Sequence, residues 1–266
     1  MTTKQNFHAH TPRCQHAEGT DESYIQSAIR GGFSTLGISD HTPWPFASGY
    51  VSHIRMTCDQ LPEYIASLRG LREKYRGQID LRIGVEAEWF PRYSDWLPRM
   101  REAGVEYFIL GQHQVDTEEE NPYVGSEWAL DDDHVRRYAD SCAEALRTGW
   151  YSYVCHPDLF MRHRSADSFD AACEAAADTI CQAALEAGVP LEYNLLGLSL
   201  QNGDGTGYPN PAFWQYAAKW GNKAILGVDA HRPMALEDTA LWDRGAEELK
   251  ALGYERVEGL VIPELG

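Results

Sequence analysis

The segment NFHAHTPRCQH, residues 6–16, contains three histidines within nine residues. Successive side chains of an extended strand alternate between its two faces, so His8 and His10 would point the same way if residues 6–10 are extended. A neutral imidazole offers one ring nitrogen to a metal while a neighbouring acceptor holds the other. The pattern alone also fits two polar residues on a half-exposed strand, and the remaining histidines must decide between the two interpretations.

Short apolar, β-branched runs alternate with amphipathic helical stretches along the chain. This alternation is typical of parallel strands joined by helices. We predict seven strands, which end at His8, Ser39, Glu86, Leu110, Cys155, Asn194 and Val228. Helical patterns separate them, and another covers residues 235–253 after the last strand. The sequence therefore predicts an α/β barrel.

Two connections between these elements are longer than the others, Thr42 to Asp59 and Asp116 to Leu130. Both follow strand ends and contain Pro, Gly and aromatic residues. Such segments can form walls over a pocket, and solvated insertions are the alternative.

Composition narrows the class of protein. The chain has 266 residues, of which 43% are hydrophobic, so we expect a single domain over residues 1–266. Its 40 acidic and 23 basic residues give a net charge of -17, which disfavours nucleic acid and anionic membranes as partners. No long apolar run is present, and we expect a cytoplasmic protein. The sequence does not specify the oligomeric state. Six cysteines without CxxC spacing indicate reduced thiols.

Histidines and carboxylates gather at the predicted strand ends. They occur in the segments SDH, GVE, GQH, CHPD and GVDAH, each of which lies at or just after the end of a predicted strand. In a parallel barrel these ends open onto one face, where residues from separate strands assemble an active site. The candidate metal ligands are His8, His10, His16, His41, Glu86, His113, His156, Asp229 and His231. His8 and His10 are thus expected to form one corner of a distributed site.

The ligand set bounds the number and kind of metals. Catalytic sites commonly use about three protein ligands per metal, so nine ligands suit two or three ions. Imidazoles with a few carboxylates favour zinc, iron or manganese over magnesium or calcium. The sequence leaves open whether Cys14, which lies among the histidines, contributes.

The motifs HAHT, CQHA, SDH, RM, LPEY, GVEAE, GQH, HPDL, EYN and DAHRP occur in this order. In this respect the chain resembles the polymerase and histidinol phosphatase (PHP) superfamily, in particular its histidinol-phosphate phosphatase branch, over residues 8–233. The resemblance implies a distorted (β/α)7 TIM-like barrel with a trinuclear metal centre at the C-terminal ends of the strands.

The resemblance also implies ligand roles. One metal would be held by His8, His10, Glu86 and Asp229; Glu86 would bridge to a second metal, completed by His113 and His156; and His16, His41 and His231 would hold the third. Glu88 shares a strand face with Glu86 and would be a supporting residue. This chain departs from many such phosphatases at Gly111-Gln112 and at Leu195-Leu196-Gly197, and both changes concern the substrate pocket rather than a metal ligand.

Metal ions that lower the pKa of a bound water and shield phosphate oxygens suit hydrolysis of a phosphate monoester by a metal-bound hydroxide. L-histidinol phosphate, a small phosphorylated metabolite of histidine biosynthesis, is the substrate that the resemblance favours. The alternatives are another PHP-type phosphoesterase activity, on a nucleotide or sugar phosphate, and a nuclease or proofreading module, which lacks support because no Lys/Arg run appears.

Several other residues are candidates for substrate binding or catalysis. Arginine can grip phosphate with two parallel hydrogen bonds, and a surface salt bridge is the alternative role. The substrate-binding candidates are Arg162, Arg232, Arg55 and Asn194. Asp40 and Asp158 adjoin ligand histidines, so together with Glu86 they are catalytic candidates; either aspartate would orient an imidazole, which we favour, or protonate the leaving oxygen.

Overall fold

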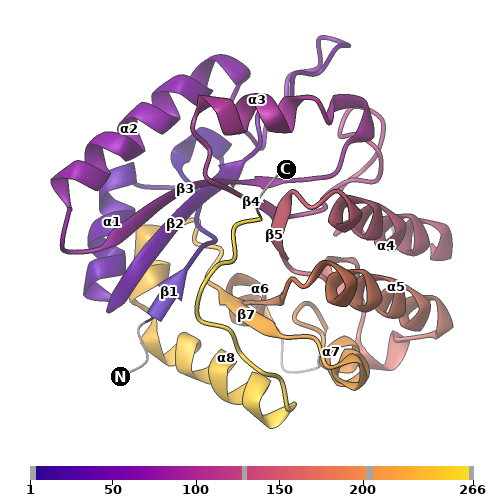
Figure 1. Ribbon diagram of the computed structural model, residues 1–266. Helices are drawn as coiled ribbons and strands as arrows, with labels where there is room; N and C mark the ends of the chain where they lie inside the picture. Colours follow the sequence, from indigo (N-terminus) through magenta and orange to yellow (C-terminus); the bar gives the residue numbers. More distant parts are fainter. Residues whose placement is uncertain (1–3, 128–130, 202–205, 264–266) are drawn as a thin grey trace.

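The computed structural model describes residues 4–127, 131–201 and 206–263. They form one parallel sheet in which neighbouring strands follow chain order. The strands are β1 (Lys4–Asn6), β2 (Phe33–His41), β3 (Asp80–Ala87), β4 (Tyr107–Leu110), β5 (Tyr151–Val154), β6 (Leu191–Asn194) and β7 (Ala224–Gly227). Figure 1 shows this sheet curled on itself inside a ring of helices. The seven-stranded barrel prediction is confirmed.

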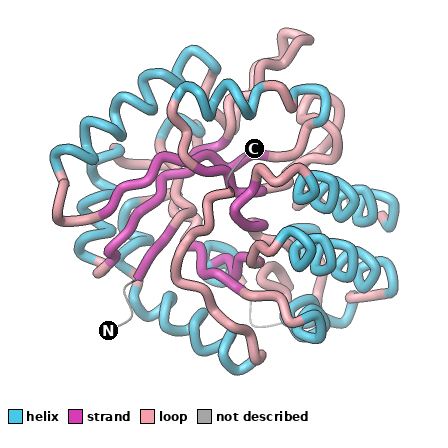
Figure 2. The backbone as a smooth tube through the Cα atoms, in the orientation of Figure 1, coloured by secondary structure: helices cyan, strands magenta, loops and turns pink. Residues whose placement is uncertain are grey.

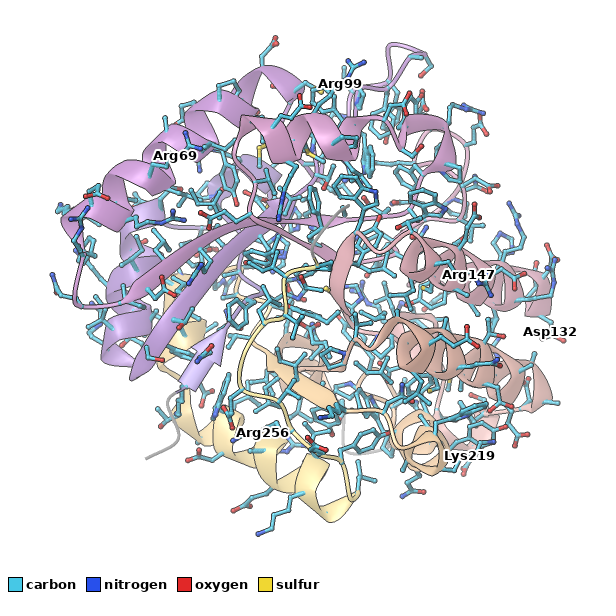
Figure 3. All side chains as sticks on the ribbon, in the orientation of Figure 1. Arg69, Arg99, Asp132, Arg147, Lys219 and Arg256 are labelled. Atoms are coloured by element: carbon cyan, nitrogen blue, oxygen red, sulfur yellow. The ribbon has the colours of Figure 1, made fainter. Side chains whose placement is uncertain are left out.

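The helices lie outside the strands (Figure 2). They are α1 (Asp21–Arg30), α2 (Leu61–Lys74), α3 (Trp96–Ala103), α4 (Asp132–Arg147), α5 (Ala171–Ala187), α6 (Leu195–Leu200), α7 (Pro211–Ala217) and α8 (Thr239–Ala251). Side-chain caps start several of them, as Asp170 does by accepting from two backbone N–H groups of α5. Charged residues such as Arg99, Arg147 and Lys219 lie at the periphery of the helical ring in Figure 3. The sequence pattern did not predict α6.

The barrel closes at one point between its first and last strands. Strand β1 ends at Asn6, two residues earlier than predicted, but the extended backbone continues to a bridge between Ala9 and Ala230. There His10 N donates to the carbonyl oxygen of Ala230 at 2.9 Å, and the N–H of Ala230 donates to His8 O at 3.3 Å. The alternation of side chains is therefore kept, and both histidines enter the barrel mouth.

The opposite end of the barrel is filled by Tyr107. Its ring lies against two glycines, Gly37 of β2 and Gly84 of β3, where a β-carbon would come within 2.1 and 2.3 Å of the tyrosine. Its hydroxyl donates to the carbonyl oxygen of Phe7 at 2.9 Å. The segment after α8, drawn in yellow in Figure 1, runs back over this end, where Val257, Leu260 and Ile262 pack against the same cluster. The candidate metal ligands therefore lie at the other mouth of the barrel.

The two long connections contribute to a pocket at that mouth. A cavity of about 570 Å³ is lined in part by Tyr50 and Ile54 from the first connection and by Glu118, Asn121 and Tyr123 from the second. The prediction that these segments form pocket walls is confirmed for their described parts; residues 128–130 lie outside the described chain.

Two further observations concern the chain as a whole. All six cysteines are free thiols, five of them buried. No helix within residues 4–127, 131–201 and 206–263 has both the length and the apolar character needed to cross a membrane.

Replacing Gly84 with alanine tests the packing of Tyr107. The added methyl group would overlap the ring, and overpacking of this kind costs roughly 1–3 kcal/mol. The matched control is Gly70→Ala in α2, where nothing lies within 4 Å and the free energy of unfolding should stay equal or rise by up to about 1 kcal/mol. Urea titration of both variants measures the difference, and equal stabilities would contradict this account of the barrel floor.

Candidate metal centre

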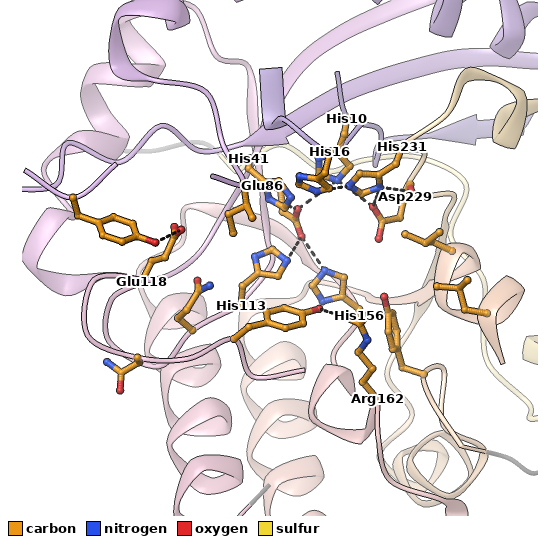
Figure 4. A pocket seen from close by; sticks show the side chains of 18 residues that line it. His10, His16, His41, Glu86, His113, Glu118, His156, Arg162, Asp229 and His231 are labelled. Carbon is orange, nitrogen blue, oxygen red and sulfur yellow. Dashed lines mark hydrogen bonds and ion pairs between the residues drawn. The ribbon is translucent and has the colours of Figure 1, made fainter. Parts of the chain in front are cut away.

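The carboxylate of Glu86 lies at the centre of the pocket floor. It is 1% exposed, at the end of β3, and five imidazoles surround it. The distances to its oxygens are 2.9 Å from His156 Nε2, 3.0 Å from His41 Nδ1, 3.4 Å from His113 Nε2, 3.5 Å from His8 Nε2 and 3.6 Å from His10 Nε2. Figure 4 shows the imidazoles of His10, His41, His113 and His156 converging on this carboxylate from separate elements. Strands far apart in the sequence therefore deliver their polar ends to one point.

Asp229 forms a second centre next to the first. Its Oδ1 lies 3.1 Å from His10 Nε2, 3.3 Å from His8 Nε2 and 3.3 Å from His231 Nδ1. The other ring nitrogen of His231, Nε2, faces Nε2 of His16 at 3.0 Å. All nine predicted ligands thus lie in one connected cluster.

Two residues of the cluster have unusual backbone conformations. His156 has φ of 28° and Asp229 has φ of 52°, a region that non-glycine residues seldom adopt. Each follows directly or closely on a strand end, and the turn directs its side chain inward. Such conformations persist where the surrounding structure enforces them, and they concentrate at functional sites.

The cluster sets the charges of its members. Burial alone would raise the pKa of Glu86, but His113, His8 and His41 hold it well below its usual range. Burial opposes a charge on His10, yet Asp229 and Asp40 raise its pKa to about 9. The pKa of His231 falls to about 3, because it is buried and faces His10. The carboxylates therefore favour a positive charge on His10, whereas His231 stays neutral, the form in which an imidazole binds a metal.

Many of the inward-facing atoms lack a hydrogen-bond partner within the described chain. They are His8 Nε2, both ring nitrogens of His10, His41 Nδ1, His156 Nδ1, Glu86 Oε2 and Asp229 Oδ1. A buried polar atom left unpaired costs about 1–3 kcal/mol, so several together would be a large penalty without a ligand. Sets of three donors lie within 4.8 Å of one another, among them His8, His10 and Asp229. These donors fit divalent transition metals.

Cys14 lies at the edge of the cluster. Its sulfur, a nitrogen of His16 and a nitrogen of His231 also fall within 4.8 Å of one another. Burial raises the pKa of this thiol to about 12. The geometry brings Cys14 close to the cluster, where burial keeps its thiol protonated unless a metal binds it.

Buried carboxylates lie behind three of the ligand imidazoles. Glu88 Oε1 is 2.9 Å from His113 Nδ1, and Glu192 Oε1 is 2.8 Å from His8 Nδ1. Asp40 Oδ1 lies 3.7 Å from His10 Nδ1 and accepts from the N–H of His41 at 2.9 Å. At 3.7 Å Asp40 is too far from His10 Nδ1 for a hydrogen bond, so the orienting role favoured for Asp40 stays a prediction. The acceptors bonded to His113 and His8 leave the opposite nitrogen of each ring free for a metal.

Of the three arginine candidates, the structure brings one into the pocket. Arg162 lines the cavity, donates to the hydroxyl of Tyr123 at 3.1 Å and lies over the ring of the same residue. None of the ion pairs found among the described residues uses it. Its guanidinium therefore remains available to an anion.

The other two arginines are not placed to bind substrate, which corrects the expectation for both. Arg55 is 2% exposed and its guanidinium is bound by Glu88 at 3.0 Å and Glu118 at 2.7 Å, behind the pocket wall. Arg232 follows a ligand histidine, but its side chain is 73% exposed and pairs with Glu18 outside the cavity. The sequence placed both near the rim without showing which way they point.

Asn194 and Asp158 also lie away from the substrate cavity. Asn194 is 1% exposed and donates to Glu192 at 2.9 Å and to Asp229 at 3.1 Å, so it holds carboxylates rather than lining the pocket. Asp158 accepts from the backbone N–H of Asn210, and the structure shows no bond from it to the imidazole of His156. Burial raises the pKa of Asp158 to about 7. The turn after His156 directs this carboxyl toward α7, which corrects both roles expected for it.

Sequence reasoning missed Glu192 and the pocket residues Glu118 and Tyr123. A signal for Glu192 was present, because an acidic residue in the middle of a buried strand needs a partner. Glu118 and Tyr123 lie in the long connection, where no periodicity indicates direction.

The fold and the donor cluster define a metal-binding α/β barrel. The chain belongs to the PHP domain family, whose model matches residues 6–195. A protein of Deinococcus radiodurans called "Probable histidinol-phosphatase" is 30% identical over 239 residues, 88% of either chain. The "Histidinol-phosphatase" of Bacillus subtilis is 30% identical over 96 residues, 35% of this chain and 36% of that protein.

A solved structure shares the fold. The histidinol phosphate phosphatase from Lactococcus lactis, determined in complex with zinc, L-histidinol and phosphate, superposes with a TM-score of 0.70 at 18% identity and covers 96% of this chain and 95% of its own. The family resemblance predicted from the sequence motifs is confirmed.

Replacing Glu86 with glutamine tests the metal centre. The neutral amide removes the charge that five imidazoles share, so the affinity for Zn²⁺ or Mn²⁺ should fall by about tenfold or more. Metal content after dialysis, measured by mass spectrometry, reports the change. The control is His134→Gln on α4, which alters a histidine outside the cluster and should leave metal content as in the wild type; equal metal loss in both variants, or none in Glu86→Gln, would contradict the assignment.

Proposed function

We propose that this protein is a metal-dependent phosphomonoesterase that hydrolyses L-histidinol phosphate to L-histidinol and phosphate, as one domain over residues 1–266. The observation that carries the proposal is that one cavity combines the Glu86-centred donor cluster with the guanidinium of Arg162, which forms no ion pair among the described residues. Cations and a guanidinium facing the same space are suited to a phosphate ester. The names and the family of the relatives support this activity, which would serve histidine biosynthesis.

We propose two or three divalent transition metals (zinc, iron or manganese) as the cofactor. His8, His10, Glu86 and Asp229 would hold one; Glu86, His113 and His156 a second; and His16, His41 and His231 a third. Divalent cations bound there would lower the pKa of a coordinated water toward neutrality and shield the phosphate oxygens. Zinc at these positions would agree with the zinc complex of the Lactococcus lactis protein.

Arg162 would bind the phosphate group. Its position at the pocket wall, with Tyr123 beneath its guanidinium plane, restricts the side chain and leaves its N–H groups directed to an anion. It is the only arginine or lysine among the described residues that line the cavity. We therefore assign the phosphate group to Arg162 rather than to another basic side chain.

The organic part of the substrate would occupy the remaining walls. In Figure 4, Glu118 and Arg162 lie on different sides of His113. Glu118 suits the ammonium group of histidinol, while Leu196 and Leu200 offer apolar contact. The cavity volume of about 570 Å³ is within the range of small-molecule pockets. The net charge of -17 further favours a small metabolite over nucleic acid, and a cytoplasmic location follows from the proposed pathway.

Replacing Arg162 with methionine should raise KM for the phosphate ester about 10–100-fold. This range corresponds to roughly 1.5–3 kcal/mol for hydrogen bonds to a charged group. Arg232→Met serves as the matched control, because that side chain is exposed and lies outside the cavity, and its KM should remain within about twofold of the wild type. Steady-state kinetics measures both KM values. A larger rise in KM for Arg232→Met than for Arg162→Met would contradict the placement of phosphate at Arg162.

A panel of phosphomonoesters tests the substrate. Phosphate release from histidinol phosphate should exceed that from nucleoside monophosphates and sugar phosphates, and a chelator should abolish it. Activity that persists after complete removal of metal would overturn the mechanism. If histidinol phosphate were hydrolysed no better than the other esters, the substrate proposal would fail while metal-dependent hydrolysis would stand.

A further inference from the structure

Glu192 lies inside β6 and its side chain is completely buried. Its Oε1 is 2.8 Å from Nδ1 of His8. Its Oε2 accepts from the backbone N–H of His156 at 3.0 Å and from the side-chain amide of Asn194 at 2.9 Å. A carboxylate this deep in a protein is costly unless its oxygens are paired, and here three donors pair them.

Glu192 and Glu88 differ in the groups that compensate their negative charge. Glu88 occupies the equivalent position behind His113. Glu88 is bound by the guanidinium of Arg55, which it shares with Glu118, and by the indole N–H of Trp44 at 2.8 Å, so its charge is balanced in part. No lysine or arginine in residues 4–127, 131–201 and 206–263 forms an ion pair with Glu192. Among the described side chains that can carry a positive charge, only His8 therefore contacts the carboxylate of Glu192.

The neighbouring strand is shaped to admit this carboxylate. A β-carbon on Gly227 of β7 would come within 1.8 Å of Glu192 Oε1. Any residue other than glycine there would push the carboxylate away from His8. The position of Glu192 is therefore built into two adjacent strands rather than left to one rotamer.

We propose that Glu192 is a positioning residue that fixes the His8 imidazole with Nδ1 protonated and Nε2 toward Glu86 and Asp229. Its unbalanced charge makes that imidazole a stronger metal ligand, as an acceptor behind a ligating histidine generally does. Nε2 of His8 is buried, has no hydrogen-bond partner in the described chain, and lies 3.5 Å from Glu86 and 3.3 Å from Asp229. The inference rests on metal ligation by His8, which is part of the proposed function.

The variant Glu192→Gln tests this role, because it keeps the shape and an acceptor but removes the charge. Titration of the purified protein with Zn²⁺ against a colorimetric chelator should show that the affinity of one metal equivalent falls about 10–100-fold. The proton on His8 Nδ1, observed far downfield by NMR of the zinc-loaded protein, should move upfield. In the metal-free protein Glu192→Gln should lower the melting temperature no more than Glu88→Gln does, since in both an amide replaces a buried acceptor, so a selective loss of Zn²⁺ affinity separates this role from a purely structural one.

Glu88→Gln is the matched control, since it makes the same change behind His113, where Arg55 balances part of the charge. It should weaken Zn²⁺ binding less than Glu192→Gln does. Should Glu192→Gln fail to fold, Gly227→Ala displaces the same carboxylate and should also weaken one metal equivalent. Wild-type affinity in the folded Glu192 variant, or an equal loss in both glutamine variants, would overturn the proposal.

These measurements use no substrate. A protein that binds zinc as expected but does not hydrolyse histidinol phosphate would leave the role of Glu192 intact and refute the substrate. Wild-type protein that binds no metal would refute the proposed function itself.

Discussion

The burial of the Glu86 carboxylate is the constraint on which the site depends. A charge removed from water must find compensating groups, and Glu86 finds them in five imidazoles contributed by β2 and by the segments after β1, β4 and β5. Those imidazoles can meet only where parallel strands end together. The fold and the cluster therefore require each other: the barrel brings the donors into one space, and that space favours positive charge.

Glycines give these side chains the room they occupy. A β-carbon on Gly111 would come within 1.9 Å of Glu86 Oε1, and one on Gly227 within 1.8 Å of Glu192 Oε1. At the other end of the barrel, Gly37 and Gly84 make room for Tyr107 in the same way. Close packing around both ends holds the polar groups in fixed positions, and fixed donors bind metal without a large cost of rearrangement.

The fold and the positions of the metal-ligand candidates could be predicted from the sequence because both follow from strand ends. Periodicity locates a strand, and His41, Glu86 or His156 then fall at its end regardless of the details of packing. No such rule gives the direction in which the side chain of a loop residue points. Arg55 lies in the long connection after β2 and Asp158 lies two residues after His156, but they turn to Glu88 and to the backbone of Asn210. Their partners come from distant segments, so only coordinates reveal them.

Anomalous X-ray scattering from crystals of the zinc-loaded protein tests the central claim most directly. The account predicts anomalous peaks between the imidazoles and the carboxylates of Glu86 and Asp229, within coordination distance of His8 and His10. Peaks only at surface histidines such as His134, or an empty cluster at saturating zinc, would contradict it.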